Sequence, residues 1–364
     1  MIDTDKRHMA HALVLGKRGL GQTWPNPSVG CVIVKDGRIV GRGRTALGGR
    51  PHSEVVALAQ AGEAARGATA YVTLEPCSHT GKTPPCAQAL IDAGVARVVA
   101  AISDSDPRVS GQGFDMLRDA GIEVTTNVLA EEAYYDNAGF FLKVEHGRPW
   151  VTLKLASSFD GRIATASGES RWITGPEARR VVHAERARHD AVMVGAGTAR
   201  ADDPDLTVRG MGEVPQPVRI VVSRLIDIPL MSRLAGTARD VPVWICHGPD
   251  AAREICEAWE GLGARLIRCD LNGRQIDPRS LLQELGEIGL TRVFCEGGGA
   301  LAASLLGADL VDELLCFNAG IAIGAEGQPN IGALGLGRLA EAPRFHLRDV
   351  RQVGDDILHR WTRN

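Results

Sequence analysis

The sequence predicts an α/β protein that is built from two domains. Its 364 residues exceed the roughly 100–200 residues of a typical domain. Segments with helix-type and strand-type patterns alternate along the chain, as in sheets that are covered by helices. The polar segment 146–149, His-Gly-Arg-Pro, separates two such series, and its Gly and Pro favour a linker. We therefore expect one domain over residues 1–146 and a second over residues 147–364.

The first series opens with an amphipathic helix, expected over residues 4–18. Two β-type runs, 31–34 and 38–43, are joined by Asp36-Gly37, a strong signal for a hairpin. The alanine-rich segment 53–66 predicts a helix. The remaining segments continue the alternation, with strands expected over 68–74, 97–102 and 122–126 and helices over 85–93 and 114–120.

The second series has the same character and repeats no motif of the first. A helix is expected over 176–189, with Pro176 at its start and Thr174 or Gly175 as its cap. Two further helices are expected over 281–288 and 301–306. Apolar runs predict strands over 150–156, 190–194, 218–222, 241–246, 264–268 and 292–295, and closing strands over 310–317 and 345–361.

Composition and charge exclude several classes of protein. Hydrophobic residues make up 44% of the chain and charged residues 23%, which is ordinary for a globular protein and excludes a largely disordered one. The net charge of −3 opposes nucleic acid as a partner. No apolar run approaches the roughly 18 residues of a membrane span, and the N-terminus lacks the pattern of a signal peptide. Eight cysteines are too few for a disulfide scaffold, so we expect a reduced, cytoplasmic compartment.

The sharpest local feature is a candidate zinc site made of His52, Cys77 and Cys86. One imidazole and two thiolates satisfy three positions of a tetrahedral zinc and leave the fourth for water, whose pKa the metal lowers to about 7. Glu54, two residues after His52, is placed to carry a proton from that water to a leaving amine. A His-x-Glu and Pro-Cys-x-x-Cys pattern is typical of zinc enzymes that deaminate nucleobases. Here eight residues separate the two cysteines, which departs from that pattern.

A zinc site that only stabilises the fold is the alternative interpretation. Three ligands without a fourth oppose it, but His79 lies between the cysteines and offers a fourth ligand. Nearby residues suit the handling of a substrate. Asn26 lies in a proline-rich turn, where its amide could form hydrogen bonds with the donors and acceptors at the edge of a planar ring. The alternative is that it is an ordinary turn residue. Lys82 suits a phosphate, or is a solvated loop lysine.

In the second half, Lys154 lies within an otherwise apolar strand, where a buried charge is costly unless it is paired. By itself it is more typical of an edge strand. Glycine-rich turns follow the strands at 194–200 and 295–300 and favour a nucleotide cofactor. A Rossmann fingerprint fails, because Arg200 stands where its third glycine belongs. His183 and His189 are predicted on the surface, and small buried cysteines are predicted at 246, 256, 269, 295 and 316.

Together, these motifs resemble the family of bifunctional riboflavin-biosynthesis deaminase/reductases. The resemblance rests on His52-Ser-Glu54 and Glu75-Pro-Cys77-Ser-His79-Thr-Gly-Lys82-Thr-Pro-Pro-Cys86, where the eight-residue spacer is the family norm. It continues in Ser-Phe-Asp160-Gly-Arg-Ile-Ala, Ser170-Arg-Trp172-Ile-Thr174, Val-Gly-Ala-Gly-Thr198, the segment from Asp202 to Arg209, and Glu296-Gly-Gly-Gly. The match spans nearly the whole chain in family order. It implies a cytidine-deaminase-like α/β/α domain followed by a dihydrofolate-reductase-like α/β domain.

The resemblance implies two consecutive reactions on a small-molecule phosphoribosylaminopyrimidine. Zinc hydroxide would remove the 2-amino group of 2,5-diamino-6-(5-phosphoribosylamino)pyrimidin-4-one, with Glu54 delivering a proton as ammonia leaves. NADPH would then reduce the ribosyl group of the product to ribityl. The remaining expectations are a homo-oligomer and no contact with nucleic acid or membrane.

The resemblance also implies roles for individual residues. Lys154 and Glu296 would lie near the reacting sugar, and Arg209 would suit the substrate phosphate. Independently of the resemblance, the adjacent hydroxyl and positive charge of Ser223-Arg224 suggest a contact with the 2′-phosphate of NADPH. The cofactor contacts implied are Ala156, Trp172, Thr198, Asp202, Ser223, Gly297, Gly298 and Gly299, and the substrate contacts are Asn26, His79, Lys82, Ser170, Leu206 and Arg209, beside Lys154 and Glu296.

Three other functions remain as alternatives. The first is a single-activity zinc nucleobase or nucleotide deaminase whose second half only binds or oligomerises. The second is a deaminase that edits nucleic acid, which the net charge opposes. The third is a zinc-stabilised interaction protein without activity, which the open metal position and the adjacent Glu54 oppose.

Overall fold

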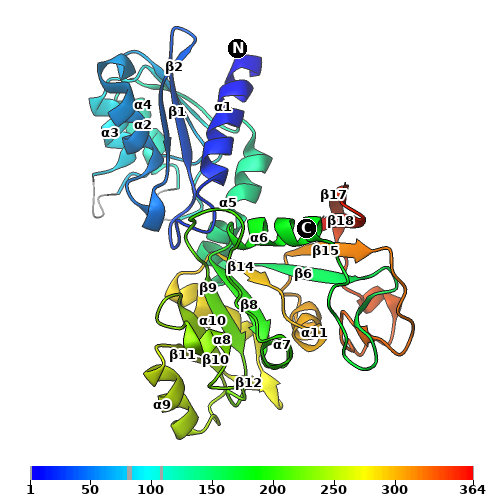
Figure 1. Cartoon of the computed structure of the whole chain (residues 1–364). Coiled ribbons are helices and arrows are strands. Elements are labelled where there is room, and N and C mark those ends of the chain that lie inside the picture. Colours follow the sequence, from blue (N-terminus) through cyan, green and yellow to red (C-terminus); the bar gives the residue numbers. More distant parts are fainter. Residues whose placement is uncertain (1, 80–83, 107–109, 364) are drawn as a thin grey trace. The chain divides into compact units, whose positions relative to one another are not determined.

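The chain forms two compact units, Met1–Gly147 and Arg148–Asn364, in a computed structural model that describes residues 2–79, 84–106 and 110–363 (Figure 1). The border falls inside the segment predicted as a linker. There helix α5 (Ala130–His146) ends at Gly147, whose φ of 70° lies in the left-handed region that favours glycine. Within the described ranges, no helix is long and apolar enough to span a membrane.

The first unit is built on a five-stranded sheet of order β2-β1-β3-β4-β5. Strand β1 pairs antiparallel with β2 and with β3, and β3, β4 and β5 run parallel. The hairpin predicted at Asp36-Gly37 joins β1 and β2. The bounds are β1 (Gly30–Lys35), β2 (Arg38–Arg44), β3 (Thr69–Val72), β4 (Arg97–Ala100) and β5 (Glu123–Thr125).

Helices cover both faces of this sheet (Figure 1). Along β1, Cys31 and Ile33 pack into the core on the side of α2 (Ser53–Ala61), α3 (Cys86–Asp92) and α4 (Gln112–Asp119). Val32 and Val34 alternate with them and pack on the side of α1 (Ile2–Lys17) and the start of α5. The period of two along the strand therefore produces a three-layer α/β/α arrangement.

Two glycines allow the close approaches that position the candidate zinc ligands. A Cβ on Gly43 of β2 would lie 2.0 Å from the carbonyl oxygen of Ser53, at the start of α2. A Cβ on Gly113 of α4 would lie 1.9 Å from the carbonyl oxygen of Pro76, next to Cys77. Side chains at these positions would push the two ligand-bearing segments away from the sheet and from α4.

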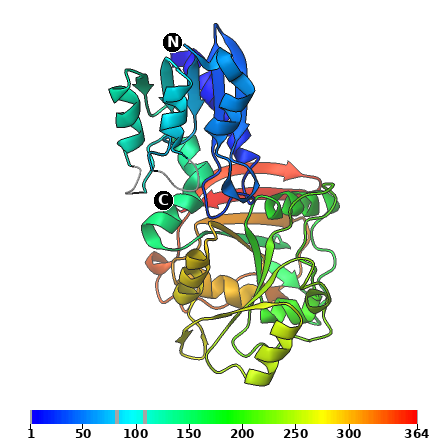
Figure 2. The same cartoon turned by 90° about the vertical axis from the view of Figure 1, so that its left-hand side faces the viewer.

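The second unit is built on a nine-stranded sheet of order β11-β10-β9-β8-β14-β6-β15-β18-β17. The strands from β11 to β15 run parallel, and the antiparallel β17–β18 hairpin forms one edge, coloured red in Figure 2. The bounds are β6 (Trp150–Ser158), β8 (Ala191–Gly195), β9 (Val218–Val222), β10 (Val243–His247), β11 (Arg265–Arg268), β14 (Arg292–Cys295), β15 (Glu313–Ala319), β17 (His346–Val353) and β18 (Asp356–Thr362).

The helices of the second unit are α6 (Pro176–Arg186), α7 (Ala196–Asp202), α8 (Arg233–Gly236), α9 (Arg253–Gly261), α10 (Pro278–Ile288) and α11 (Gly299–Gly307). Small two-stranded sheets pair β7 (Arg162–Ala164) with β16 (Gln328–Pro329), and β12 (Leu271–Asn272) with β13 (Gln275–Ile276). Short 3₁₀ turns cover η1 (Leu47–Gly49), η2 (Gly62–Ala65) and η3 (Leu339–Glu341).

The structure corrects several sequence predictions. The helix expected over 53–66 ends at Ala61, because Gly62 adopts a φ of 54° and a 3₁₀ turn follows. Helices α5, α7, α8 and α9 were not predicted. Lys154 lies in β6, an interior strand between β14 and β15, so its edge-strand interpretation is wrong. Of the five cysteines predicted as buried, Cys256 is half-buried and the other four are buried.

The surface prediction is wrong for His189, which is 2% exposed. Helix α6 ends at Arg186, and the chain then turns inward to begin β8. The Nδ1 atom of His189 lies 2.7 Å from the carbonyl oxygen of Glu185, and its Nε2 lies 3.0 Å from Oγ1 of Thr152. His183 is half-buried and lines a cavity together with Lys154.

Candidate active sites

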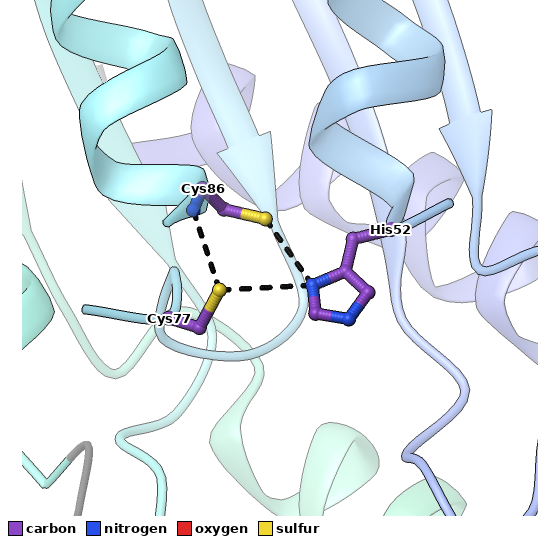
Figure 3. A group of neighbouring side chains, drawn as sticks. All are labelled: His52, Cys77 and Cys86. Atoms are coloured by element: carbon purple, nitrogen blue, oxygen red, sulfur yellow. Dashed lines mark hydrogen bonds between the residues drawn. The ribbon is translucent and has the colours of Figure 1, made fainter. Parts of the chain in front are cut away.

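The candidate zinc ligands converge in the first unit (Figure 3). His52 precedes the first turn of α2, Cys86 begins α3, and Cys77 lies in the loop that leads from β3 to α3. The Nδ1 atom of His52 lies 3.3 Å from Sγ of Cys86 and 3.7 Å from Sγ of Cys77. All three donor atoms lie within 4.8 Å of one another.

This donor set fits zinc. Bond lengths of about 2.3 Å to sulfur and about 2.0 Å to nitrogen, at tetrahedral angles, separate a sulfur from a nitrogen by about 3.5 Å. The observed separations lie on either side of that value. A hydrogen bond with Cys86 and a second with His52 lower the pKa of Cys77 to about 4, which favours the thiolate that binds metal. Among the described residues, the donor group consists of these three side chains, and His79 is not part of it.

Glu54 lies in the first turn of α2 and is 4% exposed. Burial raises the pKa of its carboxyl group, while a hydrogen bond of 2.7 Å from the Ser53 hydroxyl acts in the opposite direction. The net pKa lies above the ordinary value for Glu. A carboxyl group in such surroundings is suited to accept and release a proton.

The substrate contacts expected in this unit are located in part. The Asn26 amide donates a hydrogen bond of 3.3 Å to the carbonyl oxygen of Gly49, which ties the proline-rich turn to η1. His79 is half-buried in the loop that also carries Cys77. Lys82 lies outside the described residues.

A cavity of about 450 Å³ lies in the second unit and is lined by residues of β6, β8, α6 and α7 and by Glu296, which follows β14. It brings together predicted site residues that lie far apart in the sequence. Its lining includes Lys154, Ser170, Trp172, Leu206, Arg209 and Glu296, all of them predicted site residues.

A larger cavity, of about 970 Å³, adjoins the first and shares Lys154, Ser170 and Glu296 with it. Its lining includes the predicted cofactor contacts Ala156, Thr198, Asp202, Gly297, Gly298 and Gly299. Ser223 lines neither cavity. It is buried, and its hydroxyl donates a hydrogen bond of 2.6 Å to Asp227. Arg224 forms an ion pair of 2.8 Å with Asp250.

Three charged side chains meet where the two cavities join. Arg186 binds Glu296 through two hydrogen bonds of 2.6 and 3.1 Å, and Nζ of Lys154 lies 3.9 Å from the same carboxylate. Burial raises the pKa of Glu296, but the charges of Arg186 and Lys154 outweigh it and the net pKa is lowered. Burial also lowers the pKa of Lys154. The cluster combines an ionised carboxylate with an ammonium group that gives up its proton more easily than usual.

Besides Lys154 and Arg209, the smaller cavity contains basic residues that were not predicted from the sequence. Arg179, Val182, His183 and Arg186 line it from one face of α6, at the i, i+3, i+4 and i+7 spacing of a helix. That periodicity was a usable signal, because a helix face with repeated cations next to a glycine-rich strand end suits an anionic ligand. Arg179 also places its guanidinium carbon 4.4 Å from the ring centre of Trp172. Arg171 and Arg233 are the other basic lining residues that were not predicted.

Two family models match the chain. The model described as cytidine and deoxycytidylate deaminase zinc-binding region matches residues 2–102, and the RibD C-terminal domain matches residues 149–359. The riboflavin biosynthesis protein RibD of Escherichia coli is 43% identical over 98% of both chains. The protein of the same name from Aquifex aeolicus is 40% identical over 98% of both.

Solved structures agree with these matches. RibD of Acinetobacter baumannii superposes with a TM-score of 0.88 at 40% identity, over 100% of this chain and 99% of that chain. A diaminohydroxyphosphoribosylaminopyrimidine deaminase/5-amino-6-(5-phosphoribosylamino)uracil reductase of Thermotoga maritima superposes with a TM-score of 0.87 at 33% identity, over 100% and 99%. The chain therefore belongs to the RibD family of riboflavin biosynthesis enzymes, which join a cytidine-deaminase-like domain to a reductase domain.

Proposed function

We propose that residues 1–146 remove the 2-amino group of 2,5-diamino-6-(5-phosphoribosylamino)pyrimidin-4-one by hydrolysis, and that residues 147–364 then reduce the ribosyl group of the product to ribityl with NADPH. The observation that carries this proposal is the presence of two chemically different sites in separate units. One has metal donors beside a buried carboxyl group, and the other has a charged cluster beside a glycine-lined cavity. The name of the Thermotoga maritima relative describes the same pair of activities.

In the first site, His52, Cys77 and Cys86 would hold zinc. When bound, zinc supplies a hydroxide nucleophile at neutral pH by lowering the pKa of water to about 7. Glu54 would accept the proton that the water loses and deliver it to the amino nitrogen, which leaves as ammonia while a carbonyl group replaces it. Asn26, His79 and Lys82 would contact the pyrimidine and its phosphoribosyl group.

In the second unit, the larger cavity would hold NADPH, which supplies a hydride when bound. Gly297, Gly298 and Gly299 leave room for the cofactor beside Thr198, whose hydroxyl accepts a hydrogen bond of 3.0 Å from the Gly298 backbone. The other proposed cofactor contacts are Ala156 and Asp202, which line this cavity, Trp172, which lines the smaller one, and Ser223, which lines neither. Ser223 can make that contact only if its hydroxyl leaves Asp227.

The smaller cavity would hold the pyrimidine substrate against Ser170, Leu206 and Arg209. Arg209 would bind the phosphate, exchanging its ion pair of 2.7 Å with Asp205 for that ligand. We place Lys154 and Glu296 against the reacting sugar, where the two cavities meet. Arg186 would hold the Glu296 carboxylate in place.

Two expectations accompany this function. Eight free cysteines fit a reduced, cytoplasmic compartment. A homo-oligomer stays a prediction. A single-activity deaminase is not favoured, because the second half matches the RibD C-terminal domain over residues 149–359.

The decisive experiment separates the two activities. In a Glu54→Ala variant we expect deamination to fall by about 10²–10⁴-fold, because the proton carrier is lost, while reduction of supplied deaminated pyrimidine persists. Glu63→Ala, which changes an exposed carboxylate of the same unit, is the matched control. Removing zinc with a chelator should also abolish deamination and spare reduction. Loss of both activities in a folded, zinc-loaded Glu54→Ala protein would overturn the two-site proposal.

A further inference from the structure

Asp160 lies in the turn between β6 and β7, and nothing in the proposed chemistry uses it. Its Oδ2 accepts a hydrogen bond of 2.8 Å from the backbone N–H of Gly324, and both carboxylate oxygens lie 3.3 Å from the N–H of Ile323. The Ser158 hydroxyl donates to Oδ1. This hydroxyl and the backbone donors hold the pKa of Asp160 at about 2, so the carboxylate is ionised at neutral pH.

The same turn binds the chain beyond β15 at further points. The N–H of Phe159 donates to the carbonyl oxygen of Ile321 at 3.1 Å, and the N–H of Asn330 donates to that of Gly161 at 3.0 Å. Strand β7 pairs antiparallel with β16. We name residues 321–334 the wall segment. Within the described chain, the Asp160 side chain links this turn to the wall segment through its hydrogen bonds to Ile323 and Gly324.

The wall segment forms one side of the larger cavity. Gln328, Pro329, Asn330, Gly332, Ala333 and Leu334 line it, as do the glycines at 297–299. The two sets of residues are in direct contact, because the N–H of Gly332 donates a hydrogen bond of 2.9 Å to the carbonyl oxygen of Gly299. A Cβ on Gly299 would lie 2.9 Å from the carbonyl oxygen of Pro329. The position of the wall segment therefore sets the shape of the space beside the glycines.

Apolar packing does little to hold this segment. Of residues 321–334, all of which the structure describes, Gly327 alone is buried. A segment with so little buried apolar surface depends on its hydrogen bonds for a fixed position. Bonds to an ionised carboxylate are the strongest kind available to its backbone.

We propose that Asp160 is a positioning residue for the cofactor half of the reductase cavity. Its carboxylate fixes the backbone at Ile323 and Gly324, and this holds residues 328–334 at the distance from Gly297–Gly299 that NADPH requires. This inference rests on the proposed reductase function, and it assigns Asp160 no contact with substrate or cofactor.

The test compares Asp160→Asn and Asp160→Ala with Glu326→Gln, which removes an exposed carboxylate from the wall segment itself. We expect Asp160→Ala to raise the KM and the directly titrated Kd for NADPH by roughly tenfold, because it removes bonds to a charged acceptor. Asp160→Asn keeps one acceptor oxygen, so its KM and Kd for NADPH should rise less than those of Asp160→Ala. The KM for deaminated pyrimidine and the deamination rate should stay within about twofold of wild type, since neither depends on this wall. Hydrogen exchange of residues 321–327 should be faster in Asp160→Ala and unchanged in Glu326→Gln.

Every outcome bears on the inference. An unchanged KM for NADPH in folded Asp160→Ala, with wild-type protein reducing normally, would overturn it and leave the proposed function intact. A similar rise in the KM for NADPH and in the KM for deaminated pyrimidine, together with a fall in kcat, would also overturn it, because that pattern indicates general damage to the unit. If wild-type protein fails to oxidise NADPH with the deaminated pyrimidine, the proposed function itself has failed.

Discussion

His189 combines complete burial with a titratable ring, and this makes it sensitive to pH. Its Nδ1 faces the carbonyl oxygen of Glu185, which only accepts, so Nδ1 carries the hydrogen. Burial lowers the pKa of His189 from 6.5 to about 4. The folded protein therefore resists protonation at a pH where the unfolded chain accepts it. The neutral ring contributes its full stability above pH 6.5 and loses it as the pH falls toward 4.

We predict that the unfolding free energy of the second unit falls by about 1.6 kcal/mol between pH 6.5 and pH 5 through His189. Burial also lowers the pKa values of His183 and His359, so these residues make the unfolding free energy fall further as the pH is lowered. Urea unfolding followed by tryptophan fluorescence measures it, because five of the six tryptophans lie in this unit. His189→Gln should flatten the slope and His346→Gln, an exposed control, should not. An equally steep slope in His189→Gln would contradict the assignment.

At the scale of elements, the contact between β2 and α2 positions part of the candidate zinc site. Helix α2 starts directly after His52 and carries Glu54 in its first turn. The helix approaches β2 so closely that a Cβ on Gly43 would lie 2.0 Å from the carbonyl oxygen of Ser53 and 2.7 Å from the backbone nitrogen of Ala57. Backbone atoms cannot move aside as a flexible side chain can, so a methyl group here must displace the helix.

We predict that Gly43→Ala destabilises the first unit by about 1–3 kcal/mol and lowers its zinc content, because α2 moves away from β2. Val55→Ala, at a position on the same helix that is 37% exposed, is the control and should keep its zinc. Metal analysis of the purified variants and their unfolding curves measure both effects. Full zinc occupancy and wild-type stability in Gly43→Ala would show that the helix tolerates the displacement.

At the scale of the whole molecule, each unit has its own core and its own candidate site. The first unit contains the candidate metal donors, and the second contains both cavities. No residue proposed for one reaction lies in the unit proposed for the other. The two reactions should therefore be separable between molecules.

We predict that an equimolar mixture of Glu54→Ala and Glu296→Gln converts the diamino pyrimidine to the reduced product, although neither variant does so alone. Glu296→Gln removes the carboxylate that Arg186 and Lys154 share, so it should stop at the deaminated intermediate. Product identification after incubation with NADPH measures the outcome. A mixture of Glu54→Ala and Cys86→Ala, both altered at the zinc site, is the control and should form no product. Failure of the first mixture would mean that the two sites must share one chain.

Sequence patterns predicted regular elements with one apolar face better than elements that bury polar groups. The β1–β2 hairpin and α1 follow simple periodicity and were predicted. Helix α5 was missed, because its buried face includes polar residues that blur the hydrophobic pattern. Asn137 accepts a hydrogen bond from the backbone of Ser28, and Asp136 pairs with Lys17. Such partners are remote in sequence, so periodicity alone does not reveal them.

By itself, the sequence predicted the α/β class, a division into two domains and three candidate metal ligands, because each depends on composition or on a short motif with a fixed chemical purpose. Only the tertiary structure decided that Lys154 lies in an interior strand, that Arg186 clamps Glu296, that His189 is buried and that Asp160 holds the wall segment. The contacts behind these facts involve residues that lie as many as 164 positions apart in the sequence. The physical reason is that the burial and charge of a side chain are set by its neighbours in space, and those neighbours are known only once the chain has folded.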